Sequence, residues 1–316
     1  MKAAKEIKKM NVPSLKKTKN KIYYKLDYFI LYGMIAVPII YYIIFHYLPI
    51  VGILIAFADY RVSGFKGWVG FENFKFIFRL PFFWKSFINT WFFVLLRYIF
   101  LFPAPIILAL LLNEIRIRKY KKTVQTISTL PHFISWVVIA GIWISILSPT
   151  TGYVNEVIKF FGGEPIFFMS KSKLFPFLFT FLRGWKDIGY SAIIYLAALA
   201  GVNPELYESA VIDGAGRLKQ AIYITLPSIK PIILVVFVLS FTHVLTLFEP
   251  IYVLKNPMIQ SSAEVIDTYV YNLGVVQAKF PYATAVGLFK STISLVMVLF
   301  ANILSKKLTE DKRGIL

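Results

Sequence analysis

The sequence predicts an all-α, polytopic membrane protein with six transmembrane helices. Hydrophobic residues make up 58% of the 316 residues and charged residues only 16%, and the mean hydropathy is +0.67. This composition is unlike that of an ordinary soluble domain. Six apolar runs are long enough to cross a bilayer, since about twenty residues suffice. Basic residues concentrate in alternate segments between the runs, as expected for loops on one face of a membrane.

The chain begins with a lysine-rich head over residues 1–27, which contains nine lysines and only two acidic residues, Glu6 and Asp27. The basic region and the apolar run after it are both longer than in a cleavable signal peptide. We interpret residues 1–27 as an uncleaved cytoplasmic tail near anionic lipid.

The predicted transmembrane domain covers residues 28–305, and a short cytoplasmic tail follows over 306–316. The second predicted span contains Pro103 and Pro105, which favour a kink or a broken helix. The six apolar runs cover residues 29–57, 87–112, 124–148, 174–201, 231–254 and 284–305.

Orientation follows from the basic residues that flank the runs. The head, residues 116–122, the segment between the fourth and fifth runs and the C-terminal tail carry most of the Lys and Arg residues. The sequence therefore predicts that both termini and this segment are cytoplasmic. The net charge of +19 then records topology rather than nucleic-acid binding.

A polar segment, residues 203–230, separates the fourth and fifth runs and reads as two short helices joined by a tight turn. Asn203 is a good N-cap, and Pro204 suits the first helical position. Gly214 supplies the backbone freedom for a sharp reversal, and Pro227 and Pro231 mark the start of the next run. The segment is a predicted docking element, with two expected apolar sides: Leu206, Tyr207, Ala210 and Val211 on the first helix, and Leu218, Ala221 and Ile222 on the second.

The blocks Glu208-Ser209-Ala210, Asp213-Gly214-Ala215 and Ile224-Thr225-Leu226-Pro227 resemble the cytoplasmic loop of bacterial ABC importer permeases. The family pattern has alanine where this chain has Ser209, a small residue that should preserve the helix contact. The resemblance implies that this loop is a coupling helix seated on an ATP-hydrolysing subunit. It assigns the ATPase contact to Tyr207, Glu208, Ser209, Ala210, Asp213, Gly214 and Ala215.

The resemblance extends over nearly the whole chain and implies the type I importer permease fold. Further blocks are similar to maltose-permease-like subunits that take up complex saccharides, such as pectin- or alginate-derived oligosaccharides. These blocks are Asn89-Thr90, Leu130-Pro131-His132-Phe133, Ile266 to Tyr271 and Ala283 to Phe289.

The resemblance also implies the partners and the location. A second homologous permease, two ATP-binding subunits that use ATP and magnesium, and an extracytoplasmic solute-binding protein are expected in the bacterial inner membrane. The binding protein would dock on residues 59–85, 149–173 and 255–283. The implied mechanism is alternating access, which carries an oligosaccharide into the cytoplasm. Nucleic acid is not an expected partner.

The chain shows no chemistry of its own. It has no cysteine and no Gly-Lys dipeptide, which excludes thiolate sites and a Walker-type phosphate loop. The histidines, His46, His132 and His243, are scattered over three runs, and packing is the usual role of a lone histidine in a helix. We therefore expect no enzyme activity, no bound cofactor and no metal site.

Charged residues inside apolar runs are expensive to bury and point to a transport pathway. The pathway candidates, with two aromatic residues that could stack on a sugar, are Arg97, Trp185, Lys186, Asp187, Tyr190 and Glu249. An Arg183–Asp187 pair within one helix, aromatic packing, and a snorkelling Lys290 are the alternatives. Basic groups in a cavity would suit an acidic sugar such as a uronate.

Two other classes stay open at this point. A membrane-embedded transferase acting on lipid-linked sugars would share the composition, although the outer loops show no cluster of catalytic groups. A channel or secondary transporter would need no cytoplasmic elbow and typically shows internal repeats, of which none is evident.

Overall fold

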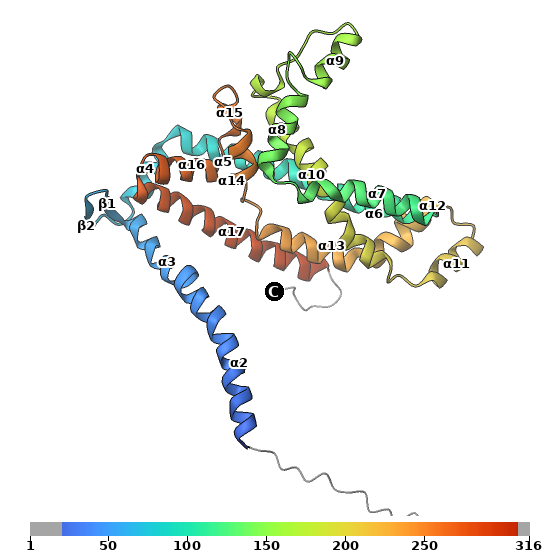
Figure 1. Cartoon of the computed structure of the whole chain (residues 1–316), viewed down its shortest axis with the longest axis horizontal. Helices are drawn as coiled ribbons and strands as arrows, with labels where there is room; N and C mark the ends of the chain where they lie inside the picture. The colour runs from blue at the N-terminus through green and yellow to red at the C-terminus, as the bar shows by residue number, and fades with distance from the viewer. Residues whose placement is uncertain (1–20, 309–316) are drawn as a thin grey trace, which may run out of the picture. The chain divides into compact units, whose positions relative to one another are not determined.

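The computed structural model describes the backbone of residues 21–308 and the side chains of residues 28–307. These residues are mostly helical, as predicted (Figure 1). The chain divides into two units, residues 1–53 and 54–316. The predicted N-terminal tail lies outside the described residues over 1–20, and the predicted C-terminal tail does so over 309–316.

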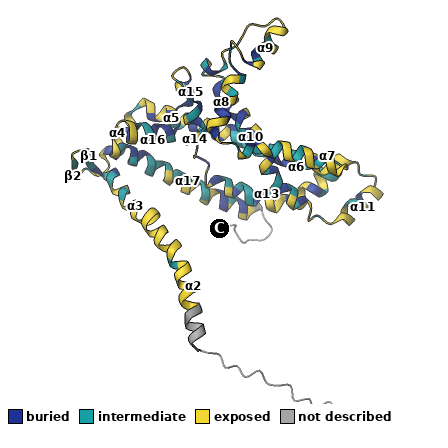
Figure 2. Ribbon diagram, viewed as in Figure 1, coloured by how far each residue is buried: buried dark blue, intermediate teal, exposed yellow. Residues whose placement is uncertain are grey.

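The first unit contains one long apolar helical stretch. Helix α2 (Lys21–Tyr42) continues through a π-helical turn (Ile43–Tyr47) into α3 (Leu48–Ile50), and a 3-10 turn, η3 (Val51–Phe57), crosses into the second unit. The stretch Tyr28–Phe57 has a mean hydropathy of 2.2, and only 6% of its most apolar window is buried (Figure 2). A helix that is apolar all round needs lipid or another chain as its surroundings.

The second unit begins with a β-hairpin and continues with helices. Its elements are β1 (Ala58–Arg61), β2 (Gly64–Trp68), α4 (Glu72–Arg79), α5 (Pro81–Leu96), the π-turn η4 (Arg97–Leu101), α6 (Pro103–Glu114), α7 (Arg118–Thr129), η5 (Leu130–Phe133), α8 (Trp136–Ile146), α9 (Tyr153–Phe160), η6 (Phe168–Ser170), α10 (Phe175–Leu199), α11 (Pro204–Ile212), α12 (Arg217–Gln220), the π-turn η7 (Ala221–Thr225), α13 (Leu226–Phe241), α14 (Phe248–Leu254), α15 (Gln260–Ala263), α16 (Ile266–Tyr271), the π-turn η8 (Asn272–Val276) and α17 (Phe280–Leu308).

Four helical stretches of the described chain are long and apolar enough to span a membrane: Tyr28–Phe57, Pro81–Glu114, Arg217–Phe241 and Phe280–Lys307. A fifth span forms if Arg118–Phe133 and Trp136–Ile146, which meet at a bend of 106°, are taken together. Helix α10 has 25 residues, enough to cross, but it carries three charged side chains at its centre. The predicted count of six spans therefore remains a prediction.

The predicted fifth run, residues 231–254, differs from the structure at both ends. The helix begins at Arg217 and ends at Phe241, so the second half of the predicted elbow is the start of a long helix. Pro227 lies in the first turn of α13, and Pro231 is accommodated inside α13. Neither proline marks a boundary, because a transmembrane helix tolerates proline when its neighbours satisfy the freed backbone groups.

Helix α10 lies at the centre of the second unit. It packs against α6, with Ala192, Tyr195 and Leu199 in one buried cluster with residues of α6 and α13. It also approaches α7 so closely that a Cβ at Gly189 would lie 2.1 Å from the Ser128 carbonyl oxygen. The absence of a side chain at Gly189 thus lets α7 and α10 pack closely. The charged residues at the centre of α10, Arg183, Lys186 and Asp187, lie in this packed region.

Candidate functional site

A cavity of about 560 Å³ lies between the turns η4 and η5 and the helices α6, α10 and α13. Its size falls within the usual range of small-molecule sites, roughly 300–1,000 Å³. Its lining comprises Arg97, Leu101, Phe102, Pro105, His132, Arg183, Gly184, Asp187, Ile188, Tyr190, Ser191, Tyr195, Val236, Ser240 and His243.

Irregular backbone surrounds this cavity. The π-turn η4 begins at Arg97, the turn η5 leads into the 106° bend, and α13 ends at Phe241 just before His243. Non-helical backbone at membrane depth is tolerated only where it is buried in protein or lines a cavity. Three chain segments therefore contribute their breaks to the same place, which is where a substrate path is expected in transporters.

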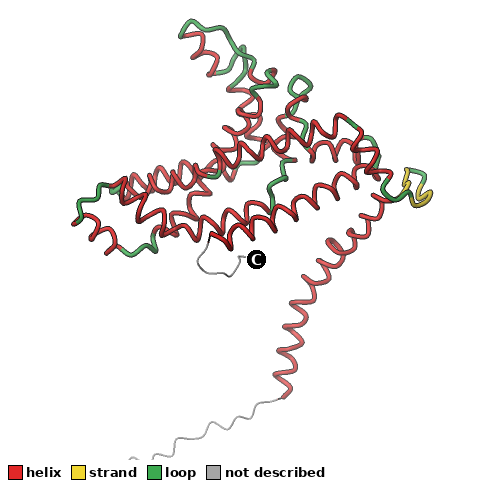
Figure 3. Tube along the Cα trace, turned by 180° about the vertical axis from the view of Figure 1, so that it is seen from behind, coloured by secondary structure: helices red, strands yellow, loops and turns green. Residues whose placement is uncertain are grey.

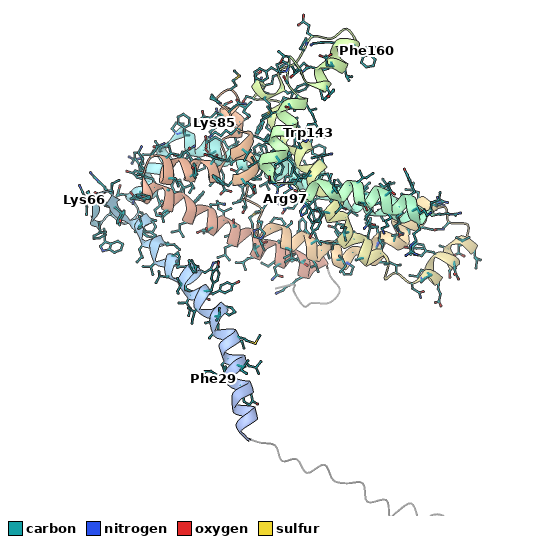
Figure 4. All side chains as sticks on the ribbon, in the orientation of Figure 1. Phe29, Lys66, Lys85, Arg97, Trp143 and Phe160 are labelled. Carbon is teal, nitrogen blue, oxygen red and sulfur yellow. The ribbon has the colours of Figure 1, made fainter. Side chains whose placement is uncertain are left out.

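Two arginines from different helices give the cavity its charge. Arg97 Nη1 donates to the His243 carbonyl oxygen at 3.4 Å, and Figure 4 labels Arg97 at the centre of the second unit. Arg183 Nε lies 3.9 Å from Asp187 Oδ2. Asp187 is also 3.0 Å from Nδ1 of His132, so its carboxylate is engaged on both oxygens. The intrahelical pair is present, yet both its members line the cavity.

An aromatic pair forms part of the wall. The rings of His132 and Tyr190 are stacked in parallel, with centroids 3.8 Å apart and an angle of 4° between the planes. The stack fixes the His132 ring while its Nδ1 faces Asp187. The sequence predicted Tyr190 for the pathway, and the structure places it in the lining.

Three predicted pathway residues do not line the cavity. Lys186 is 7% exposed, and its ammonium donates to the carbonyl oxygens of His132 and Ile134 at 2.6 Å each and of Pro131 at 3.4 Å. These three contacts tie Lys186 to the break between α7 and α8. The other two are Trp185, whose ring meets Trp143 edge-on at 5.6 Å, and Glu249, an exposed residue in the first turn of α14.

Sequence reasoning missed Arg183, His132 and His243 as lining residues. The four-residue spacing of Arg183 and Asp187 predicted a helix pair, and the histidines were interpreted as packing residues. A signal was present for His132, because Pro131 before it and the adjoining short polar stretch predict a helix break. Lys290 was also misjudged: instead of snorkelling, it forms an ion pair with Asp267, which also accepts from the Leu247 amide at 2.8 Å.

The predicted coupling elbow has a well-defined first helix, α11. Asn203 Oδ1 accepts from the Glu205 amide at 3.1 Å, which is the predicted N-cap. At the other end Gly214 has φ +73°, and the amides of Gly214 and Ala215 donate to the carbonyls of Val211 and Ala210 at 3.1 and 2.8 Å. This is a Schellman motif, which ends a helix with a left-handed residue.

Side chains inside the elbow fix α11 to the start of the next helix. Tyr207 Oη donates to Thr225 Oγ1 at 3.0 Å, and Gln220 Nε2 donates to the Ala215 carbonyl at 2.7 Å. Ala210 is buried. The predicted contact residues Tyr207, Ala210 and Ala215 thus hold the shape of the elbow.

The outer surface of the elbow is both polar and apolar. Glu208, Ser209, Asp213 and Gly214 are exposed, and the side chain of Ile212 is 86% exposed. The predicted division into one apolar side per helix is wrong in detail, because Tyr207 and Ala210 turn inward. The exposed apolar residues beside the acidic ones are Leu206, Val211, Ile212, Leu218, Ile222 and Tyr223. Such a surface fits a protein partner.

No group of three or more His, Asp or Glu residues in the described part of the chain has the arrangement of a metal site.

Comparison with known proteins identifies the family. Residues 106–310 match the family described as binding-protein-dependent transport system inner membrane component. The polygalacturonan/rhamnogalacturonan transport system permease protein YteP of Bacillus subtilis (strain 168) is 45% identical over 285 residues, 89% of each chain. Protein LplB of the same organism is 41% identical over 285 residues, 89% of this chain and 90% of that one.

Solved structures agree with the sequence relatives. A chain of a bacterial ABC transporter involved in the import of the acidic polysaccharide alginate has a TM-score of 0.85 and 39% identity, covering 92% of this chain and 99% of that one. A chain of the bacterial alginate ABC transporter in complex with an alginate pentasaccharide-bound periplasmic protein has a TM-score of 0.84 and 40% identity, covering 89% and 96%. The chain therefore belongs to the family of binding-protein-dependent transport system inner membrane components and is an ABC transporter permease of the sugar-uptake type, which confirms the resemblance seen in its sequence.

Proposed function

We propose that this chain is the transmembrane subunit of an ATP-driven importer that moves an acidic oligosaccharide into the cytoplasm by alternating access. The observation that carries this proposal is the cavity with Arg97 and Arg183 on facing helices. Guanidinium groups bind carboxylates with paired, charge-assisted hydrogen bonds. A uronate-containing chain presents one carboxylate on each such sugar unit.

The relatives support an acidic substrate. One permease at 45% identity serves transport of polygalacturonan and rhamnogalacturonan, and the structural neighbour serves import of alginate, an acidic polysaccharide. The stacked His132–Tyr190 pair offers an apolar ring face beside the arginines. The combination of charge and ring surface suits a pyranose that carries a carboxylate.

The elbow is the proposed entry point for energy. Its Schellman motif and the Tyr207–Thr225 hydrogen bond give α11 a fixed shape, while Glu208 and Ile212 face outward. We infer that this surface contacts one ATP-binding subunit, where ATP and magnesium are used. Arg217 Nε lies 3.7 Å from Glu114 Oε2 at the end of α6, which is an exposed contact between the elbow and a helix that lines the cavity.

A second permease subunit and an extracytoplasmic binding protein complete the proposed assembly. The four apolar spans of the described chain have only 6% to 28% of their most apolar windows buried, which leaves surface for a homologous chain and for lipid. The loop around α9 is a candidate for the binding protein. Asn155 fixes it with hydrogen bonds to Leu147, Ser148 and Ile166, and Phe160 at its end is 84% exposed.

Reconstitution of the purified assembly in lipid vesicles tests the proposal. ATP hydrolysis is followed while the binding protein is added with matched neutral and acidic oligosaccharides. We expect stimulation by the acidic class. Stimulation by the neutral class alone would refute the substrate assignment, and an assembly without any ATP-hydrolysing subunit would favour the transferase or the channel.

A further inference from the structure

The β1–β2 hairpin is a small two-stranded element that carries exposed apolar side chains. Its strands pair antiparallel, with Ala58 opposite Trp68 and Arg61 opposite Gly64. Asn73 is buried, and its Nδ2 donates to the carbonyls of Ala56 and Ala58 at 2.9 and 3.0 Å. These two hydrogen bonds attach the base of the hairpin to α4.

Side chains of the hairpin and of the following turn are exposed although they are apolar. Val62 is 82% exposed and Trp68 is 64% exposed, and Phe65 and Phe71 are exposed as well. The Phe65 and Trp68 rings lie 5.3 Å apart, centroid to centroid. Lys66 and Arg61, the latter paired with Asp59 at 3.0 Å, are exposed beside them, and Figure 4 labels Lys66 on this hairpin. The surface combines aromatic rings with cationic side chains.

The hairpin lies where apolar spans end. The stretch Tyr28–Phe57 ends one residue before β1, and α17 begins beside it: the rings of Tyr60 and Phe280 are 6.4 Å apart. Figures 1 and 3 both show β1 and β2 next to the first turn of α17, at the opposite end of the second unit from α11. Because a span end lies at the membrane surface, the hairpin lies at that surface too.

These observations indicate that the hairpin contacts lipid and that it lies in the headgroup region of the bilayer. Tryptophan and phenylalanine with neighbouring Lys and Arg are typical of the headgroup region. A two-stranded sheet has two open edges, whose unpaired backbone groups exclude it from the hydrocarbon core. We propose that the β1–β2 hairpin is a lipid anchor, whose exposed apolar residues Val62 at the turn and Phe65 and Trp68 on β2 insert into the headgroup layer on the side opposite the elbow. This goes beyond the proposed transport function and does not depend on its substrate.

The chain's lack of cysteine makes a direct test straightforward. Val62→Cys and Phe65→Cys variants of the purified transporter carry a nitroxide spin label in phosphatidylcholine–phosphatidylglycerol vesicles. Collisions of the label with oxygen, which partitions into lipid, are compared with collisions with a water-soluble nickel chelate. Glu164→Cys, at an exposed charged position after α9, is the aqueous control and is measured before the binding protein is added. All three side chains are exposed, and retained ATP hydrolysis by the assembly verifies the fold.

We expect the ratio of oxygen to nickel collisions at positions 62 and 65 to be several-fold higher than at position 164. We also expect it to stay unchanged when the binding protein is added with its oligosaccharide. A ratio equal to that at position 164 would overturn the proposal. Aqueous labels that become immobilised when the loaded binding protein is added would also overturn it, and would assign the hairpin to that protein.

Discussion

Arg97 is the cavity residue whose charge is most available to a ligand, because the partner described for it is a backbone carbonyl rather than a carboxylate. We predict that Arg97→Gln weakens uptake of an acidic oligosaccharide by roughly tenfold to a hundredfold, since a hydrogen bond to a charged group contributes about 1.5–3 kcal/mol. Half-saturating concentrations for acidic and neutral oligosaccharides of equal length measure the effect. An equal loss for both would contradict a role in carboxylate binding.

Lys186 has a different role, in which its ammonium serves three carbonyl groups of the break before α8. We predict that Lys186→Met lowers the free energy of unfolding by about 1–3 kcal/mol or more, because buried carbonyls lose their donor. Thermal unfolding in detergent measures this. Glu249→Gln, at an exposed site, is the matched control and should leave the unfolding temperature unchanged. A stable Lys186→Met protein with a selective loss of acidic substrates would restore the pathway role predicted from sequence.

The sequence predicted charged cavity residues only in part, and the reason is geometric. Because burying a charge is costly, each charged residue within an apolar run stands out in the sequence. The sequence does not show whether that side chain lines a cavity or is hydrogen-bonded to a backbone carbonyl. Lys186 and Asp187 are neighbours in sequence and point to different environments. Only the packing of α10 against η5 decides between them.

At the scale of the element, Gly214 ends α11 with a positive φ. We predict that Gly214→Val preserves membrane insertion but uncouples ATP hydrolysis from uptake, because a β-branched residue in the left-handed region costs about 1–2 kcal/mol or more and the Schellman turn is lost. The ratio of ATP hydrolysed to oligosaccharide imported measures coupling.

Gly216→Ala is the matched control for this change. Gly216 has φ −69°, and nothing lies within 4 Å of an added Cβ, so the variant should transport normally. Normal coupling in Gly214→Val would argue strongly against the elbow as the ATPase contact.

The predicted helix boundaries agree with the structure where they were based on polar capping residues. They differ from it where they were based on prolines. Asn203 and Gly214 bound α11 as predicted. Pro227 and Pro231 did not start a helix, because the chain had already entered one at Arg217. A proline restricts the residues before it, but it does not by itself decide which side of it is helical.

At the scale of the whole second unit, the pair of Lys290 and Asp267 joins α17 to α16, and Asp267 also accepts from the Leu247 amide before α14. We predict that Lys290→Met destabilises the protein more than the double variant Lys290→Met/Asp267→Asn, because a single change leaves an uncompensated buried charge. Unfolding temperatures of the wild type, the two single variants and the double variant form the required cycle. Strictly additive effects would show that the pair does not act as a unit.

The helical architecture with several apolar spans was accessible from sequence because hydropathy reports on it, and the loop motif indicated the family. The orientation inferred from the basic flanks stays a prediction. The cavity was not accessible from sequence, since it is made where breaks in three segments distant in sequence come together. The number of spans is hard to predict for the same reason. Helix α10 is long enough to span a membrane, but its charged residues are accounted for only by their contacts with one another and with η5 in the folded chain.

The three hydrogen bonds from Lys186 to the break between α7 and α8 have a consequence for biosynthesis. The carbonyl groups it serves lie 52 to 55 residues earlier in the chain than the lysine itself, so the ribosome delivers them first. Exposed carbonyls are not tolerated in hydrocarbon. If the bent segment of α7 and α8 crosses the bilayer as one span, it is stable there only once α10 has been made, and we expect these two segments to leave the insertion machinery together.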